Sequence, residues 1–331
     1  MDETSSNNNP SLLYSKKRGA RVAYLGNSIQ YFNDTPRFMI RLSRQAVVNN
    51  ANPKEPYDAF IEHQNSCFRG GANLGRLWRE GNGMLNHGFA SKTAIMKVTD
   101  DGDNIIYDVG SPTVEDLLAL KDWDFIVMND HTQGPARLES RNAAREILME
   151  KYAPLIAANQ AISIIIETVA YRFEEINGSR DLGTVYEFQQ KVREGVLSYV
   201  DALRTKLPPF ISPRIAPVGA AYLHVHEHNF VLWEQLFDSY DSFHPSPKGT
   251  FLQGCVLHYS MFLSPPQIPS TEEGIADLWK DARMMNWVGK KQGYEIMPLP
   301  TVEEAKYLLQ VSIFVCDREL NKYDAEPCTE S

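Results

Sequence analysis

The chain has no long hydrophobic run, and this absence argues against one class of protein. None of its apolar stretches reaches the roughly 18 residues that a membrane-spanning helix needs. The first 20 residues are polar, with asparagines at 7–9 and basic residues at 16–18, so they do not contain the apolar core of a signal peptide. We therefore expect a cytoplasmic protein with no transmembrane segment.

Cysteine and positive charge are also scarce. The four cysteines, Cys67, Cys255, Cys316 and Cys328, form no C-x-x-C pair and are too few in 331 residues for a disulfide scaffold. The formal net charge is −9, which argues against a nucleic-acid-binding protein because such proteins carry basic patches. The hydrophobic content of 43% is that of an ordinary globular chain.

Short apolar segments alternate with helical patterns along the chain. Alternation of this kind predicts a parallel sheet covered by helices on both faces. The expected strands are 21–25, 58–63, 124–128, 161–166 and 214–218, and the expected helices are 36–49, 73–80, 139–158, 183–205 and 247–262.

The pattern suggests three regions. Residues 1–19 are expected to be a disordered lead, 20–263 a single α/β domain, and 264–331 a helical C-terminal extension packed on that domain. An insertion at about 82–113 predicts a β-hairpin with an Asp-Gly turn at Asp101-Gly102. A calcium loop is a poor alternative there, because the glutamate at its twelfth position is missing. The insertion enters between the second and third strands, so we expect it to shape a ligand pocket.

A serine follows the first predicted strand on a tight turn. The apolar run Val22-Ala23-Tyr24-Leu25 leads into Gly26-Asn27-Ser28. In open parallel sheets, ligands bind beyond the carboxyl ends of the strands, where this serine would lie. Ser28 is therefore a candidate nucleophile, although a serine that only caps the turn is the simpler alternative. The G-x-S-x-G pattern of α/β-hydrolases is absent.

A second motif, Asp241-Ser242-Phe243-His244-Pro245, follows the last predicted strand. The spacing allows the Asp241 carboxylate to reach the imidazole of His244 across a turn and fix its tautomer. Asp238 is a second possible partner for this histidine. Together with Ser28, the pair supplies a nucleophile, a base and a group that orients the base.

These motifs, in this order, resemble the GDSL/SGNH hydrolase superfamily, in a divergent branch. Gly26-Asn27-Ser28-Ile29 stands where the family has G-D-S-L, and Asn129-Asp130 stands where it has G-x-N-D, without the glycine. Gly70 and Gly71 are candidates for the glycine after the second strand. The resemblance covers about residues 20–263. It implies a three-layer α/β/α sandwich with a mostly parallel five-stranded sheet, of flavodoxin-like type.

The resemblance also implies an oxyanion hole. Its expected donors are the backbone N–H of Ser28, the N–H of Gly71 and the side-chain amide of Asn129. Gly70 and Gln133 are the second choices for the last two donors.

Other chemistries have weaker support. His224, His226 and His228 resemble a metal cluster, but on a helix only the outer two would share a face. Cys67 is a conceivable nucleophile, but a buried and inert thiol is the simpler reading. We expect no metal and no cofactor.

The sequence thus predicts a serine hydrolase, most simply an esterase that acts on a small-molecule, carbohydrate or lipid acyl ester. The triad would be Ser28, His244 and Asp241. The alternative is a non-catalytic ligand-binding protein that retains the fold. The sequence leaves the substrate and the oligomeric state open.

Overall fold

A computed structural model describes residues 19–49, 60–85, 96–98, 105–107, 110–120, 122–175, 178–239, 241–280, 282 and 297–324. At its centre lie parallel strands in the order β2-β1-β5-β6-β7. This is the flavodoxin-like order, and it confirms the predicted five-stranded parallel sheet. The strands are β1 (Ala20–Gly26), β2 (Ile61–Phe68), β5 (Phe125–Met128), β6 (Ile162–Ile166) and β7 (Arg214–Ala216).

The first strand shows why the sheet is buried on both faces. Val22 and Tyr24 belong to the hydrophobic cluster on one face, and Ala23 and Leu25 to the cluster on the other. All four side chains are fully buried. Because successive side chains of a strand point to opposite faces, a continuous apolar run needs a helical layer on each side.

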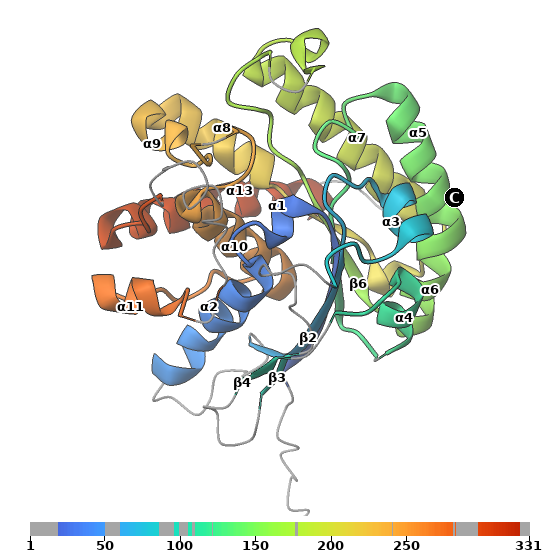
Figure 1. Cartoon of the computed structure of the whole chain (residues 1–331), viewed down its shortest axis with the longest axis horizontal. Helices are drawn as coiled ribbons and strands as arrows, with labels where there is room; N and C mark the ends of the chain where they lie inside the picture. Colours follow the sequence, from blue (N-terminus) through green and yellow to red (C-terminus); the bar gives the residue numbers. More distant parts are fainter. Residues whose placement is uncertain are drawn as a thin grey trace, which may run out of the picture.

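Helices supply these two layers, which lie on opposite sides of the sheet in Figure 1. One layer contains α2 (Thr35–Asn49), α8 (Val218–His228), α9 (Phe230–Glu234), α10 (Pro247–Phe262), α11 (Glu272–Asp277) and α13 (Val302–Asp324). The other contains α3 (Leu74–Glu80), α4 (Val114–Ala119), α5 (Leu138–Ile147), α6 (Ala153–Asn159) and α7 (Val185–Arg204). The predicted three-layer sandwich is therefore confirmed.

The helix that follows the Asp–His motif lies deep in its layer. Every residue of α10 from Pro247 to Met261 is buried, because α2, α8 and α13 surround it. A surface helix exposes one polar face to solvent, whereas this helix is covered by neighbouring elements on every side. The segment that carries His244 is consequently attached to one of the most firmly packed elements of the molecule.

The second strand differs from its prediction. It runs over Ile61–Phe68 rather than 58–63, and residues 50–59 lie outside the described residues. The predicted strand stops before the polar residues Gln64, Asn65 and Ser66. They are nevertheless buried, and the side-chain amide of Asn65 donates a hydrogen bond to the Ser111 hydroxyl at 2.9 Å.

The insertion adds two short strands to the edge of the sheet. Strands β3 (Met96–Val98) and β4 (Ile105–Tyr107) pair antiparallel, and β3 pairs with His63 and Gln64 near the start of β2. The Asp101-Gly102 turn lies outside the described residues. None of the described residues between 82 and 113 lines the pocket discussed below. That the insertion shapes this pocket therefore stays a prediction.

The predicted helix 139–158 is divided in three. Between α5 and α6, residues Leu148–Tyr152 form a turn of π-helix. Pro154 follows directly at the start of α6, and its ring lacks the N–H that a regular helix would use there. The wider turn accommodates this missing donor.

The C-terminal region packs on the same core. Val302, Ala305, Leu308 and Val311 of α13 belong to the hydrophobic cluster that includes α10. The expected helical extension thus includes a helix over Val302–Asp324, whereas residues 283–296 lie outside the described residues.

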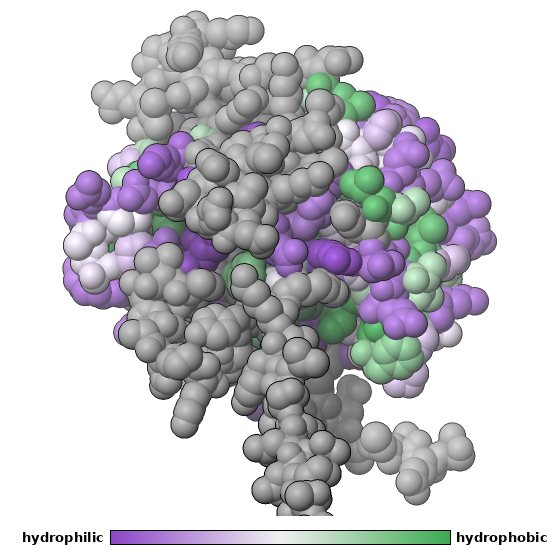
Figure 2. All heavy atoms as spheres, turned by 90° about the horizontal axis from the view of Figure 1, so that it is seen from below, coloured by the Kyte–Doolittle hydropathy of each residue, from purple (hydrophilic) through white to green (hydrophobic). Residues whose placement is uncertain are grey.

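On the face seen in Figure 2 the described surface is mainly hydrophilic, and its hydrophobic residues form separate spots. No helix within the described part of the chain has the length and apolar character needed to cross a membrane.

Candidate active site

Ser28 lies where the sequence placed it, on the turn after β1. It is the first residue of the short helix α1 (Ser28–Tyr31), so its backbone N–H has no acceptor within the helix. The side chain of Asn27 caps this helix by accepting from the Ile29 N–H at 3.1 Å. Its amide also donates to the carbonyl of Ala72 at 2.9 Å, which ties the serine turn to the glycine loop after β2.

Gly26 is required by the close approach of a neighbouring side chain. A Cβ atom at this position would lie 2.0 Å from Oδ1 of Asn129. No side chain fits in that space, so glycine is the residue that allows the serine turn and Asn129 to pack together.

Asn129 is committed to holding this turn. Its Nδ2 donates to Asn27 Oδ1 at 2.9 Å and to the Asp130 carbonyl at 2.8 Å, and its Oδ1 accepts from Gln30 at 2.7 Å. The side chain is 1% exposed and does not line the pocket. An amide has two hydrogens, and both are used here. The structure thus places Asn129 behind the serine turn rather than in the cavity before it.

Asp130, the second residue of this pair, holds neighbouring elements together. Its Oδ1 accepts from the N–H of Leu74 at the start of α3, at 3.0 Å. Its Oδ2 accepts from the hydroxyl of Tyr199 on α7, at 2.7 Å. Burial raises the pKa of this carboxyl, although these hydrogen bonds oppose the shift.

His244 and Asp241 form the expected pair. Nδ1 of His244 lies 2.5 Å from Oδ2 of Asp241. Oδ1 of the same carboxylate accepts from the backbone N–H of His244 at 3.0 Å and from that of Phe243 at 3.1 Å. Burial opposes ionisation of Asp241, but its hydrogen bonds with His244 prevail and lower its pKa. Asp238, the other possible partner, holds the loop through its backbone: its N–H donates to the carbonyl of His244 at 2.8 Å.

Aromatic rings fix the plane of the imidazole. Phe32 stacks on His244 with ring centroids 4.2 Å apart and planes within 5°. Phe243 lies against the same ring at 4.2 Å. Nε2 of His244 is buried and has no hydrogen-bond partner among the described residues. The histidine is thus held at Nδ1, and its other nitrogen is available to accept a proton.

Ser28 and His244 open onto one pocket of about 380 Å³. The Ser28 hydroxyl lies next to the phenol of Tyr31, three residues later, and makes no hydrogen bond to Nε2 of His244. Burial raises the pKa of the Tyr31 phenol. The pocket is lined by Asn27, Ser28, Tyr31, Phe32, Gly71, His131, Thr132, Gln133, Tyr171, Phe243 and His244.

The glycine loop contributes Gly71 to this pocket. Gly71 has a φ of +61°, a conformation that side-chain-bearing residues rarely adopt. No atom lies within 4 Å of the position that its Cβ would occupy, so the backbone here is open to the cavity. Gly70 does not line the pocket, and a Cβ there would lie 2.9 Å from the Tyr31 hydroxyl.

Gln133 lines the pocket from the turn after β5. Its Nε2 donates to the hydroxyl of Tyr171 at 3.3 Å, and that hydroxyl lies 2.5 Å from the Thr132 hydroxyl. His131 completes this polar wall, and burial lowers its pKa, which favours a neutral ring.

Several residues of the site were not predicted from the sequence. Tyr31 and Phe32 follow the serine in the chain, so their part in the pocket could have been suspected from proximity. Tyr171 lies after β6 and reaches the site only through the fold. Asn33 is similar: its amide donates to the Pro245 carbonyl at 2.8 Å and so joins the serine segment to the histidine loop.

The residues considered for other chemistries lie elsewhere. His224 and His228 stack on α8 with centroids 4.1 Å apart, whereas His226 turns toward Trp233. Among the described residues, no group of three potential ligands is arranged to hold a metal ion. Cys67 is fully buried, and burial raises the pKa of its thiol to about 12.

Comparisons with known proteins support the fold. No protein-family model and no curated protein sequence matches the chain. Among solved structures, a DUF4886 family protein from Bacteroides uniformis has a TM-score of 0.54 at 18% identity, over 92% of this chain and 99% of that one. This likeness shows a shared fold and no more.

Two further solved structures are less similar. "A putative SGNH hydrolase" from Slackia heliotrinireducens has a TM-score of 0.45 at 20% identity, over 74% of this chain and 100% of that one. "A putative GDSL-like lipase" from Parabacteroides merdae has a TM-score of 0.41 at 10% identity, over 74% of this chain and 96% of that one. The comparisons thus agree with the α/β/α fold that the sequence predicted, through the likeness to the DUF4886 family protein.

Proposed function

We propose that this protein is a serine hydrolase, most simply an esterase, with Ser28 as nucleophile, His244 as general base and Asp241 as the group that orients the base. One observation carries the proposal. Ser28 and His244 line the same pocket, and the imidazole is held at Nδ1 by Asp241 while Nε2 is buried without a partner. A base that is fixed at one nitrogen and unoccupied at the other is what activation of a serine requires.

The reaction would begin with a change at Ser28. Its hydroxyl turns toward Nε2 of His244 and attacks the acyl carbonyl as its proton passes to the imidazole. The tetrahedral intermediate then collapses, and the imidazolium returns the proton to the departing alcohol. Water repeats the sequence on the acyl-enzyme and releases the acid. Asp241 stays ionised and stabilises the imidazolium, consistent with its lowered pKa.

The developing oxyanion needs fixed donors. We assign the backbone N–H of Ser28 and the N–H of Gly71, which both lie at the pocket. For the third donor we favour Gln133 over Asn129. The amide of Gln133 lines the cavity, whereas both hydrogens of the Asn129 amide are bonded behind the serine turn. We propose that Asn129 supports the turn that presents Ser28.

The pocket combines two kinds of wall. Aromatic rings of Phe32 and Phe243 lie beside the histidine, and Thr132, Gln133 and Tyr171 add polar groups to the lining. A volume of about 380 Å³ suits a small ester or one end of a larger one. The family resemblance includes enzymes that act on lipids, thioesters and carbohydrates, so the fold itself does not choose among them.

One observation favours the alternative of a non-catalytic binding protein. The hydroxyl of Ser28 makes no hydrogen bond to the base, whose Nε2 has no partner among the described residues. Catalytic hydrogen bonds are often loose without substrate, so this arrangement is also compatible with an enzyme. A panel of acyl esters, run with Ser28→Ala as control, separates the two: hydrolysis by the wild type that is lost in the variant supports the esterase.

A further inference from the structure

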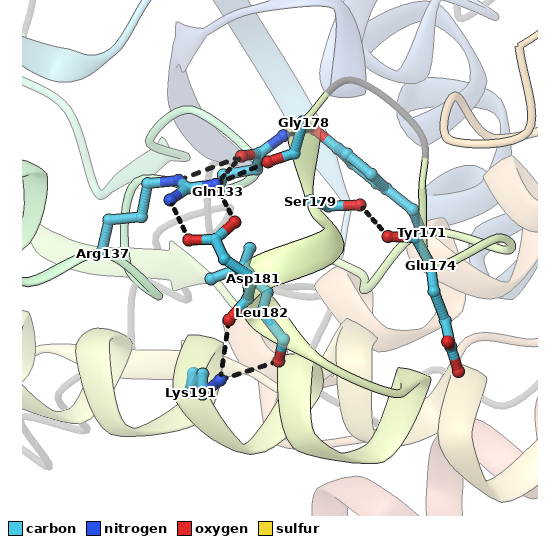
Figure 3. Close-up of polar contacts among 9 residues, drawn as sticks. All are labelled: Gln133, Arg137, Tyr171, Glu174, Gly178, Ser179, Asp181, Leu182 and Lys191. Carbon is cyan, nitrogen blue, oxygen red and sulfur yellow. Dashed lines mark hydrogen bonds and ion pairs between the residues drawn. The ribbon is translucent and has the colours of Figure 1, made fainter.

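Arg137 is joined to the pocket through one side chain, Gln133. Its guanidinium donates to Oε1 of Gln133 from Nε at 3.1 Å and from Nη2 at 2.9 Å. The same guanidinium donates to both carboxylate oxygens of Asp181, at 2.6 and 2.9 Å, and to the carbonyl of Gly178 at 2.8 Å. Figure 3 shows the Arg137 side chain with Gln133 and with the segment that contains Gly178 and Asp181.

Chemistry alone fixes which way the glutamine amide faces. A guanidinium has only donors, so the oxygen of the Gln133 amide must face Arg137. The Nε2 end must then face away from it, where it donates to the Tyr171 hydroxyl at 3.3 Å. Gln133 and Tyr171 both line the pocket, so the donor end of the amide lies on the pocket side.

The turn that holds Arg137 is itself anchored. Asp181 belongs to a 3-10 turn, η5 (Arg180–Leu182), whose last carbonyl accepts from Lys191 on α7 at 2.8 Å. The hydroxyl of Ser179 donates to the Glu174 carbonyl at 2.9 Å and braces the segment from the other side. The ion pair between Arg137 and Asp181 is solvent-exposed, with carboxylate exposure of 62%. Exposed pairs of this kind contribute little to stability, so a purely stabilising role would be a weak one.

We propose that Arg137 is a positioning residue for hydrolysis: it holds the Gln133 amide so that its N–H groups, and not its oxygen, face the developing oxyanion. This inference rests on the proposed function. Without Arg137, either end of the amide could face the pocket, and its oxygen would repel the oxyanion. Arg137 does not itself reach the pocket, so it would act entirely through Gln133.

A double-mutant cycle tests this coupling. The variants are Arg137→Ala, Gln133→Ala and the double variant, assayed for kcat and KM on p-nitrophenyl acetate and butyrate. We expect Arg137→Ala to lower kcat about tenfold with KM within about twofold, because the lost interaction belongs to the transition state. We expect Gln133→Ala to lower kcat by about 10²-fold. In the Gln133→Ala background, removal of Arg137 should then have no further effect.

Two more variants separate positioning from structure. Gln133→Glu keeps an acceptor for Arg137 but has no N–H donor, so we expect a loss of kcat at least as large as that of Gln133→Ala. Arg204→Ala removes a comparable exposed pair, with Asp201 at the far end of α7, and should leave kcat unchanged.

The outcomes are distinct. Equal losses from Arg137→Ala in both backgrounds, or a fully active Gln133→Glu, would overturn the positioning role while leaving the esterase assignment intact. If the wild type hydrolyses no ester and Ser28 reacts with no fluorophosphonate, the proposed function fails and this inference fails with it.

Discussion

Oδ2 of Asp241 lies 2.5 Å from Nδ1 of His244, and Oδ1 of the same carboxylate accepts from the backbone N–H of His244. One side chain therefore fixes both the loop and the ring that it carries. Replacing Asp241 with asparagine keeps the shape but substitutes a neutral amide for the carboxylate. We expect Asp241→Asn to lower kcat by about 10²–10⁴-fold in a folded protein, measured on an ester that the wild type hydrolyses. A variant within threefold of wild type would exclude Asp241 as the orienting group.

The same carboxylate predicts a pH dependence of stability. Its pKa is lower in the folded protein than in the unfolded chain, where it would be about 3.9. The stabilisation is therefore present above the unfolded pKa and is lost as the pH falls through the folded value. In urea unfolding between pH 3 and pH 7, the difference in unfolding free energy between wild type and Asp241→Asn should shrink at the acid end. A difference that stays constant or grows toward pH 3 would contradict the lowered pKa.

Ser28 and His244 should be essential for turnover but not for folding. Both lie on turns at the edge of the sheet. We expect Ser28→Ala and His244→Ala each to reduce hydrolysis by about 10³-fold or more, because members of a triad act as a unit. Far-ultraviolet circular dichroism and the thermal midpoint provide the check on folding. Substantial turnover by either purified variant would refute the triad.

Substitution of Asn129 should lower stability, whereas substitution of Gln133 should lower kcat. Asn129→Ala leaves the buried Asn27 Oδ1 and the Gln30 amide each short of a partner, and should cost about 1–3 kcal/mol of unfolding free energy. Gln133→Ala should reduce kcat with little change in stability. If Asn129→Ala is instead as stable as wild type and loses kcat by about 10²–10³-fold, Asn129 is the direct oxyanion donor.

Tyr31 provides a test of the serine's resting position. Tyr31→Phe removes the phenol oxygen that lies next to the Ser28 hydroxyl. We expect kcat/KM to be retained or to rise by up to about threefold, since a competing ground-state contact is lost. A loss of 10-fold or more would show that the phenol takes part in the reaction.

The sequence predicted the elements whose signals are local. The serine turn is marked by an apolar strand and a glycine, and Asp241 and His244 lie close enough in the chain to be paired by spacing. The limits of β2 were missed because Gln64–Ser66 are polar yet buried, which only their tertiary hydrogen bonds explain. Tyr171 was missed for the same reason, since it meets Gln133 and Thr132 only in the folded chain. The orientation of Asn129 likewise depends on side chains about 100 residues away.

The measurement that tests the central claim most directly is fluorophosphonate labelling of the purified full chain, with the modified peptide identified by mass spectrometry. An ordinary serine hydroxyl is a weak nucleophile at neutral pH, so an adduct reports activation by a base. We predict one adduct, at Ser28, that is absent in His244→Ala and forms more slowly in Asp241→Asn. Folded wild-type protein without an adduct at Ser28 would contradict the account, and labelling that persists in His244→Ala would show that the base is another residue.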